Sequence, residues 1–86
     1  MSHFIKIISS EEKGNVEFFF DRIASEKELR YHLTVVTNKK EIFHFTMRKD
    51  GSKWKIVEAP KPPEWIIKLQ EKLSEALNGH LSSYNT

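Results

Sequence analysis

Apolar and polar residues alternate along most of the first 59 positions of the chain. Runs of this kind, with a period of two residues, predict β-strands at residues 4–8, 16–23, 29–37, 41–49 and 53–59. The stretches between them are polar, and three of the four contain glycine or asparagine residues, which favour turns. Because short loops join antiparallel neighbours, the pattern predicts an antiparallel meander of about five strands.

The expected loops place the apolar side chains of four strands on the same face of the sheet. The loops are residues 25–28, residues 38–40 and a two-residue turn at Asp50-Gly51. The cross-strand pairs that they set are Phe20 with Leu33, Val35 with Phe43, Met47 with Trp54, and Phe45 with Ile56. A slip of one residue would turn every side chain of a strand to the other face, so this agreement predicts one continuous apolar face.

The spacing of apolar residues changes to that of a helix after Pro60, Pro62 and Pro63. Proline interrupts a strand but suits the first turn of a helix. From there one apolar stripe follows helical spacing: Trp65 at its margin, then Ile66, Leu69, Leu73, Ala76 and Leu77. We expect a helix over about residues 63–78, which Asn78-Gly79 ends, and then a flexible tail at residues 80–86. The stripe packs on the apolar face of the sheet, which gives one α+β domain over residues 1–86.

Composition narrows the chemistry that the chain can perform. It has 86 residues, of which 38% are hydrophobic, enough for one core. It has no cysteine, which excludes disulfides, thiolate metal sites and cysteine nucleophiles. Its 14 basic and 12 acidic residues give a net charge of +2, which does not by itself indicate nucleic acid. No apolar run approaches the roughly 18 residues that cross a bilayer, so we expect a small soluble cytoplasmic protein without membrane contact.

Basic side chains gather at one end of the outer face, the face of the predicted sheet that the helix leaves free. With the expected registers, Arg30 faces Arg48, Arg48 faces Lys53, and Lys55 faces Thr46. A positive surface with an exposed aromatic ring is typical of single-stranded nucleic-acid binding. The candidate residues for nucleic acid or another anion are Phe19, Arg30, His32, His44, Arg48, Lys53 and Lys55.

Apolar side chains on the same face favour a different partner. Val36 faces Ile42 in the expected register, and Ile67 falls outside the helix stripe. Apolar surface groups of this kind often mark protein contacts. The candidate residues for a protein partner or for self-association are Phe19, Val36, Ile42, Val57 and Ile67.

Evidence for catalysis is weak. Asp21 faces His32, and His44 is the diagonal neighbour of His32, so the three side chains could form an open three-ligand metal site. Their spacing lacks the density of known metal motifs. The three glycines are isolated at turns, and no serine elbow or zinc-protease helix is present. We therefore predict no catalytic residue, no metal and no cofactor, with a small metal-dependent enzyme as a distant alternative.

A run of strands followed by one helix resembles, in topology alone, the repeats of the PUR-type and Whirly single-strand-binding proteins. That resemblance rests on no residue motif, and fold analogy is a poor guide to function. The hypothesis from the sequence is a non-enzymatic binding or interaction module that uses its free sheet face or a sheet edge. Single-stranded nucleic-acid binding through the basic outer face is the alternative.

Overall fold

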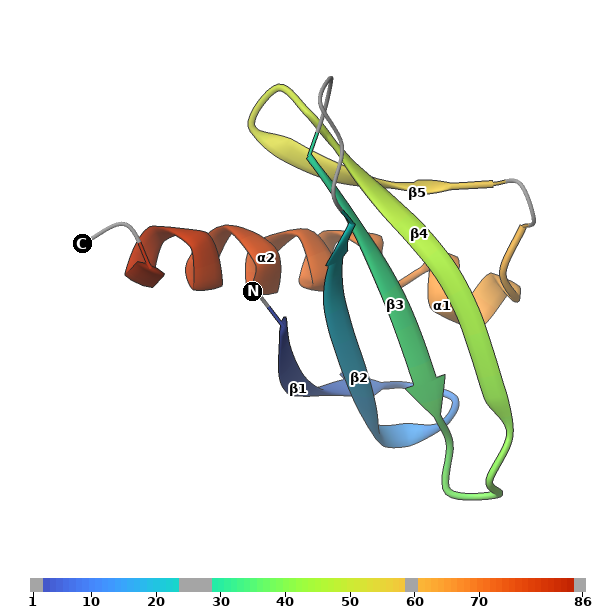
Figure 1. Ribbon diagram of the computed structural model, residues 1–86. Helices are drawn as coiled ribbons and strands as arrows, with labels where there is room; N and C mark the ends of the chain where they lie inside the picture. Colours follow the sequence, from blue (N-terminus) through green and yellow to red (C-terminus); the bar gives the residue numbers. More distant parts are fainter. Residues whose placement is uncertain (1–2, 24–28, 59–60, 85–86) are drawn as a thin grey trace.

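The computed structural model describes residues 3–23, 29–58 and 61–84. Within these residues the chain forms five strands and then two helical segments: β1 (His3–Ser10), β2 (Gly14–Ile23), β3 (Arg30–Val36), β4 (Ile42–Asp50), β5 (Lys53–Val57), α1 (Glu64–Ile67) and α2 (Gln70–Tyr84). The strands form one antiparallel sheet in the order β1-β2-β3-β4-β5. The sheet curls, and α2 crosses one of its faces (Figure 1). The predicted α+β meander with a C-terminal helix is confirmed.

The core lies between the sheet and the helices. Alternate residues of β2 to β5 point into it, and the apolar stripe of the helical segments covers them. Its largest fully buried side chains include Trp54, Tyr31, Phe18, Phe20, Leu33, Met47, Ile66, Leu73 and Leu77. Trp65 is also buried, so both tryptophans belong to the core, as the sequence predicted.

The predicted registers of β2 with β3 and of β3 with β4 are confirmed. The predicted register of β4 with β5 is wrong by two residues: Met47 faces Ile56, and Asp50 pairs with Lys53 across a turn at Gly51-Ser52. The turn begins one residue later than expected because Gly51 has a φ of 66°. Glycine with positive φ at the first central position is the pattern of a type II′ hairpin. A shift of two residues keeps every side chain on its predicted face.

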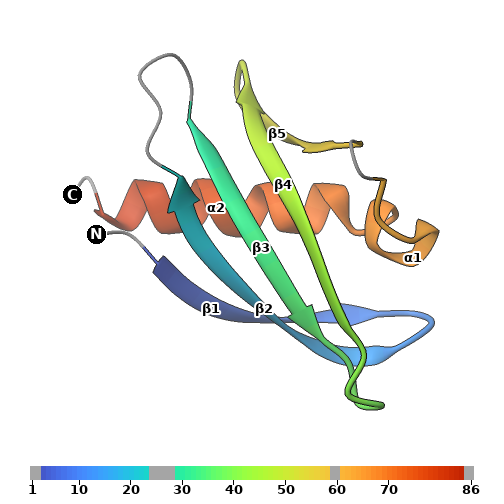
Figure 2. The same ribbon diagram turned by 45° about the vertical axis from the view of Figure 1, so that its right-hand side comes forward.

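The predicted helix is broken and longer than expected. Residues 68–69 form a turn between α1 and α2, where the Leu69 N–H donates to Ile66 O at 2.9 Å. This bond joins residues three apart, as in a 3₁₀ turn, instead of the four apart of an α-helix. Figure 2 shows α1 turned away from the axis of α2. Both segments nevertheless bury apolar residues against the sheet, Ile66 from α1 and Leu73 from α2.

The predicted end at Asn78-Gly79 is wrong, because α2 continues to Tyr84. The Asn78 side chain is engaged with the β4–β5 hairpin instead of capping the helix. Its Oδ1 accepts a hydrogen bond from Trp54 Nε1 at 3.2 Å, and its Nδ2 donates to Ser52 O at 3.0 Å. These tertiary contacts outweigh the roughly 1 kcal/mol by which glycine disfavours a helix interior. Residues 80–84 of the predicted tail are therefore helical.

Three predicted features lie in part outside the described residues. These are the loop at residues 25–28, the end of the fifth strand at residue 59, and the last two residues of the tail.

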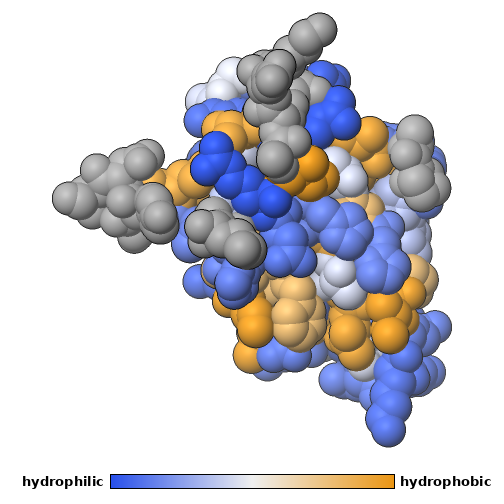
Figure 3. Space-filling view, viewed as in Figure 1, coloured by the Kyte–Doolittle hydropathy of each residue, from blue (hydrophilic) through white to orange (hydrophobic). Residues whose placement is uncertain are grey.

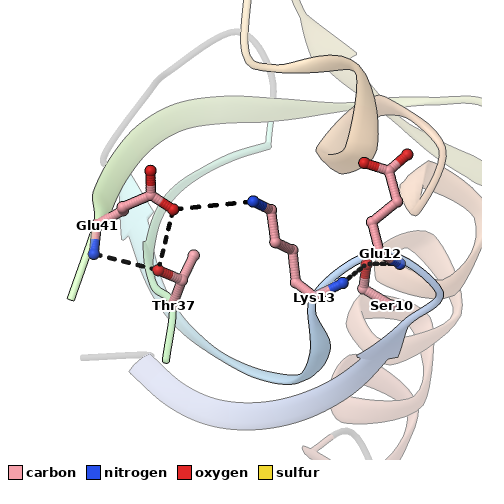
Figure 4. Close-up of polar contacts among 5 residues, drawn as sticks. All are labelled: Ser10, Glu12, Lys13, Thr37 and Glu41. Atoms are coloured by element: carbon pink, nitrogen blue, oxygen red, sulfur yellow. Dashed lines mark hydrogen bonds and ion pairs between the residues drawn. The ribbon is translucent and has the colours of Figure 1, made fainter. Parts of the chain in front are cut away.

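The β1–β2 loop and the β3–β4 loop meet at one end of the sheet (Figure 4). Ser10 Oγ accepts hydrogen bonds from the N–H groups of Glu12 and Lys13, at 3.3 and 3.2 Å. Lys13 Nζ lies 3.9 Å from Glu41 Oε1, and the Glu41 N–H donates to Thr37 Oγ1 at 3.1 Å. The side chains thus tie the two loops together and hold the ends of four strands in place.

Replacing Lys40 by glycine should stabilise the fold. Lys40 ends the β3–β4 loop with a φ of 63°, and its N–H donates to Thr37 O at 2.9 Å. A residue with a Cβ pays about 1 kcal/mol or more in this left-handed conformation, and glycine does not. We expect the free energy of unfolding to rise by about 0.5–1 kcal/mol, measured by urea denaturation. Lys39→Gly is the matched control and should destabilise, because φ at Lys39 is not positive.

Candidate functional site

The outer face of the sheet, turned away from both helical segments, is the candidate site. It carries the side chains that alternate with the core residues along each strand. Figure 3 shows this face, with hydrophobic side chains gathered over its lower part and a hydrophilic band across its middle. The cross-strand registers identify the residues of each part.

The hydrophobic part of this face is the most exposed apolar surface in the described chain. Among the described residues the exposed large hydrophobic side chains are Ile5, Ile7 and Ile42, with exposed fractions of 56%, 61% and 59%, and all three lie on the outer face. Ile5 faces the half-buried Phe19 across β1 and β2, and Ile42 faces the half-buried Val36 across β3 and β4. We call these five residues the apolar patch: Ile5, Ile7, Phe19, Val36 and Ile42.

One charged side chain interrupts the apolar patch. Glu17 faces Ile7 on β1 and Val36 on β3, so it lies in the cross-strand row that runs from Ile7 to Ile42. Glu17 is exposed. A carboxylate surrounded by apolar side chains is costly to bury without a cation, so it restricts what can cover the patch.

The structure brings together part of the predicted protein interface. Phe19, Val36 and Ile42 belong to the apolar patch. Val57 lies on the outer face as predicted, but it pairs with Thr46 on β4 and is separate from the patch. Ile67 lies on α1 and packs partly against the core. The sequence analysis missed Ile5 and Ile7, whose exposure on the outer face follows from the β1–β2 register.

The two histidines of the outer face form a close pair. The rings of His32 and His44 stack with centroids 5.3 Å apart and planes 15° apart, and Thr34 Oγ1 lies 3.2 Å from His44 Nδ1. Asp21 pairs with His32 across β2 and β3, as predicted. In the part of the chain that the structure describes, no three histidine or carboxylate side chains could together hold a metal ion. The metal site considered from the sequence therefore does not form among these residues.

The basic row differs from the predicted one. Arg30 faces Arg48 as expected, but Arg48 faces Lys55, and Lys53 faces Asp50. Lys55 Nζ lies 3.1 Å from Asp50 Oδ2. The hydrogen bond from Lys55, together with its charge, holds the pKa of Asp50 below its ordinary value, so this carboxylate is ionised at neutral pH. An acidic group thus lies within the basic row and offsets part of its charge.

Phe19, the expected stacking ring, lies apart from the basic row. It faces Thr34, whereas the row follows the pairing of Arg30 with Arg48 and Lys55. The two histidines occupy the band between them, since His32 faces Thr46 and His44 faces Thr34. The predicted nucleic-acid residues therefore share one face but are spread over most of its length.

The chain matches no protein-family model, no curated protein and no solved structure. No helix in the described part of the chain has the length and apolar character needed to cross a membrane.

Proposed function

We propose that this protein is a non-enzymatic interaction module that docks another protein on the apolar patch of its outer sheet face. The observation that carries this proposal is the gathering of Ile5, Ile7 and Ile42 on one face, each more than half exposed. Burial of apolar surface contributes about 25 cal/mol per Å², and contiguous exposed apolar patches commonly mark protein contacts.

The charges of the outer face indicate the chemistry of the partner. Glu17 lies within the apolar patch, so a partner that covers it stabilises the complex by placing a lysine or arginine beside it. Arg48 and Lys53 are exposed beyond the patch and suit acidic groups at the rim. The proposed partner surface is therefore apolar, with a cation at its centre and acidic residues on one side.

Single-stranded nucleic acid is the second candidate. The cross-strand row of Arg30, Arg48 and Lys55 favours it, because clustered arginine and lysine side chains bind phosphate groups. The ion pair of Lys55 with Asp50 offsets part of this positive charge within the chain. The apolar patch therefore ranks above the basic row.

Photo-cross-linking in cells of the native host tests the docking of a protein. A benzophenone amino acid in place of Ile42 should label one protein of defined mass, and the matched position Glu71, exposed on α2, should not. Glu17→Lys should reduce the Ile42 adduct about tenfold or more, which corresponds to at least about 1.4 kcal/mol.

The other outcomes contradict the proposal. An adduct that nucleases remove would identify nucleic acid as the ligand of this face. Equal labelling from Ile42 and Glu71, or no adduct from Ile42, would show that the apolar patch docks nothing.

A further inference from the structure

The two edges of the sheet differ in how their backbone is satisfied. Along an edge strand, alternate residues turn their N–H and C=O groups away from the sheet. In β5 these are Trp54 and Ile56. The Trp54 N–H donates to Ser74 Oγ and the Ile56 N–H to Gln70 Oε1, both at 2.9 Å. Side chains of α2 therefore occupy the place that a sixth strand would take, and they block strand addition at β5.

The hydrogen bonds of β3 with β4 determine which residues of β1 face its free edge. The Thr37 N–H donates to Glu41 O, and the Lys49 N–H donates to Leu29 O, so odd-numbered residues of β3 bond to β4. Bonding alternates from one side of a strand to the other. Carried through the registers of β3 with β2 and of β2 with β1, this alternation turns the odd-numbered residues of β1 to the free edge. They are His3, Ile5, Ile7 and Ser9.

One of these four residues is already engaged. Lys72 Nζ, from α2, donates to Ser9 O at 3.0 Å. This contact agrees with the alternation and covers one end of the edge. Three alternate residues of the β1 edge therefore keep their backbone groups available for another strand. They are His3, Ile5 and Ile7, with Ile5 at the centre. β1 forms one margin of the sheet, and α2 lies behind the sheet (Figure 1 and Figure 2).

We infer that a second copy of this chain adds to the β1 edge as an antiparallel strand, with Ile5 facing Ile5 of the second copy. A ladder of three residues about a central one is self-complementary under a twofold axis, as a symmetric dimer requires. His3 of each copy then faces Ile7 of the other, and both backbone groups of all three residues are paired. The two sheets become one.

Charges favour this register over its neighbour. Lys6 then faces Phe4 of the second copy, whereas a register centred on Lys6 would place two lysines directly opposite each other. It would also require Ser9, whose carbonyl is bound to Lys72. A face-to-face dimer through the apolar patch would bury Glu17 of both copies, and the edge dimer leaves Glu17 in water. This interface stands independently of the docking proposed for the outer face.

Single-cysteine variants test the register directly, because the chain has no cysteine of its own. In a hydrogen-bonded antiparallel pair the Cα atoms are about 5.5 Å apart, within the range that a disulfide spans. Under mild oxidation, Ile5→Cys should form a covalent dimer at least about tenfold faster than Ile7→Cys or Ile42→Cys, which are equally exposed. Two copies of residue 7 would lie about 13 Å apart along the paired strands.

Sedimentation of the cysteine-free protein supplies the second readout. Its mean mass should rise from one chain towards two between about 10 µM and about 1 mM, and Ile5→Lys should weaken dimerisation about tenfold while Ile42→Lys does not. Fastest cross-linking at Ile42 would indicate face-to-face pairing and overturn the inference. Fastest cross-linking at Ile7 would overturn the register. Equal rates at all three positions, with a monomer at every concentration, would overturn the dimer itself.

Discussion

Trp54→Ala should remove a large part of the stability of the fold. Trp54 is 1% exposed and contacts Tyr31 edge to face, with ring centroids 5.5 Å apart. Truncation of a buried tryptophan costs about 3–5 kcal/mol. The protein loses the free energy gained by moving a large ring from water into the core, and a cavity is left behind. Domains of this size are stable by about 5–10 kcal/mol in total. Urea denaturation followed by circular dichroism should show an unfolding midpoint lower than that of the wild type by about a third or more.

Trp54→Phe separates the ring from its hydrogen bond. Phenylalanine retains most of the apolar surface but lacks the Nε1–H that donates to Asn78 Oδ1 at 3.2 Å. We expect Trp54→Phe to cost about 1–2 kcal/mol, clearly less than Trp54→Ala. Trp54→Ala within about 1 kcal/mol of the wild type would contradict the placement of this ring at the centre of the core.

Period-two patterning was sufficient to predict most of the sheet. The faces of β2, β3 and β4 and two of the registers follow from alternation and loop length, because burial of one face penalises a slip of one residue. The β4–β5 register could not be predicted in this way. Turns at Asp50-Gly51 and at Gly51-Ser52 both keep Trp54 in the core, and the choice depends on which turn position Gly51 takes with its φ of 66°.

The helix shows where local signals fail. Asn78-Gly79 is a good stop signal on its own, but Asn78 bonds to the β4–β5 hairpin. Beyond it, the ring of His80 stacks on Phe4 with centroids 3.9 Å apart. Both contacts join residues that are far apart in the sequence, so they could not be predicted from the helix propensity of neighbouring residues.

Only part of the candidate site could be predicted, because some of its residues are placed by short loops and others by strand pairing alone. Val36 and Ile42 could be placed on the outer face because their register follows from a short loop. Ile5 and Ile7 could not, since the run at residues 4–8 has no clean alternation and its faces are assigned only by pairing with β2. The ion pair of Lys55 with Asp50 depends on the β4–β5 register, which the sequence analysis placed two residues away.

Ser74→Ala should destabilise the protein by about 1–3 kcal/mol, the cost of leaving a buried N–H without a partner. Ser74 is 6% exposed, and its Oγ accepts the Trp54 N–H at 2.9 Å. Alanine removes the side-chain oxygen that accepts this hydrogen bond. Urea denaturation measures the loss, and hydrogen exchange at the Trp54 amide should accelerate more than exchange at its neighbours.

Ser74→Ala also opens the β5 edge, so its effect reaches beyond stability. With one of its two capped N–H groups released, β5 becomes a template for another strand, and the variant should aggregate at concentrations where the wild type does not. Ser9→Ala is the matched control: it removes an exposed hydroxyl on β1 but keeps the carbonyl that accepts from Lys72. Its stability should stay within about 0.5 kcal/mol of the wild type. If Ser74→Ala behaved like Ser9→Ala in both measurements, the hydrogen bonds to α2 would not be what protects the β5 edge. The difference between a capped β5 edge and an open β1 edge would then no longer explain why pairing occurs at β1.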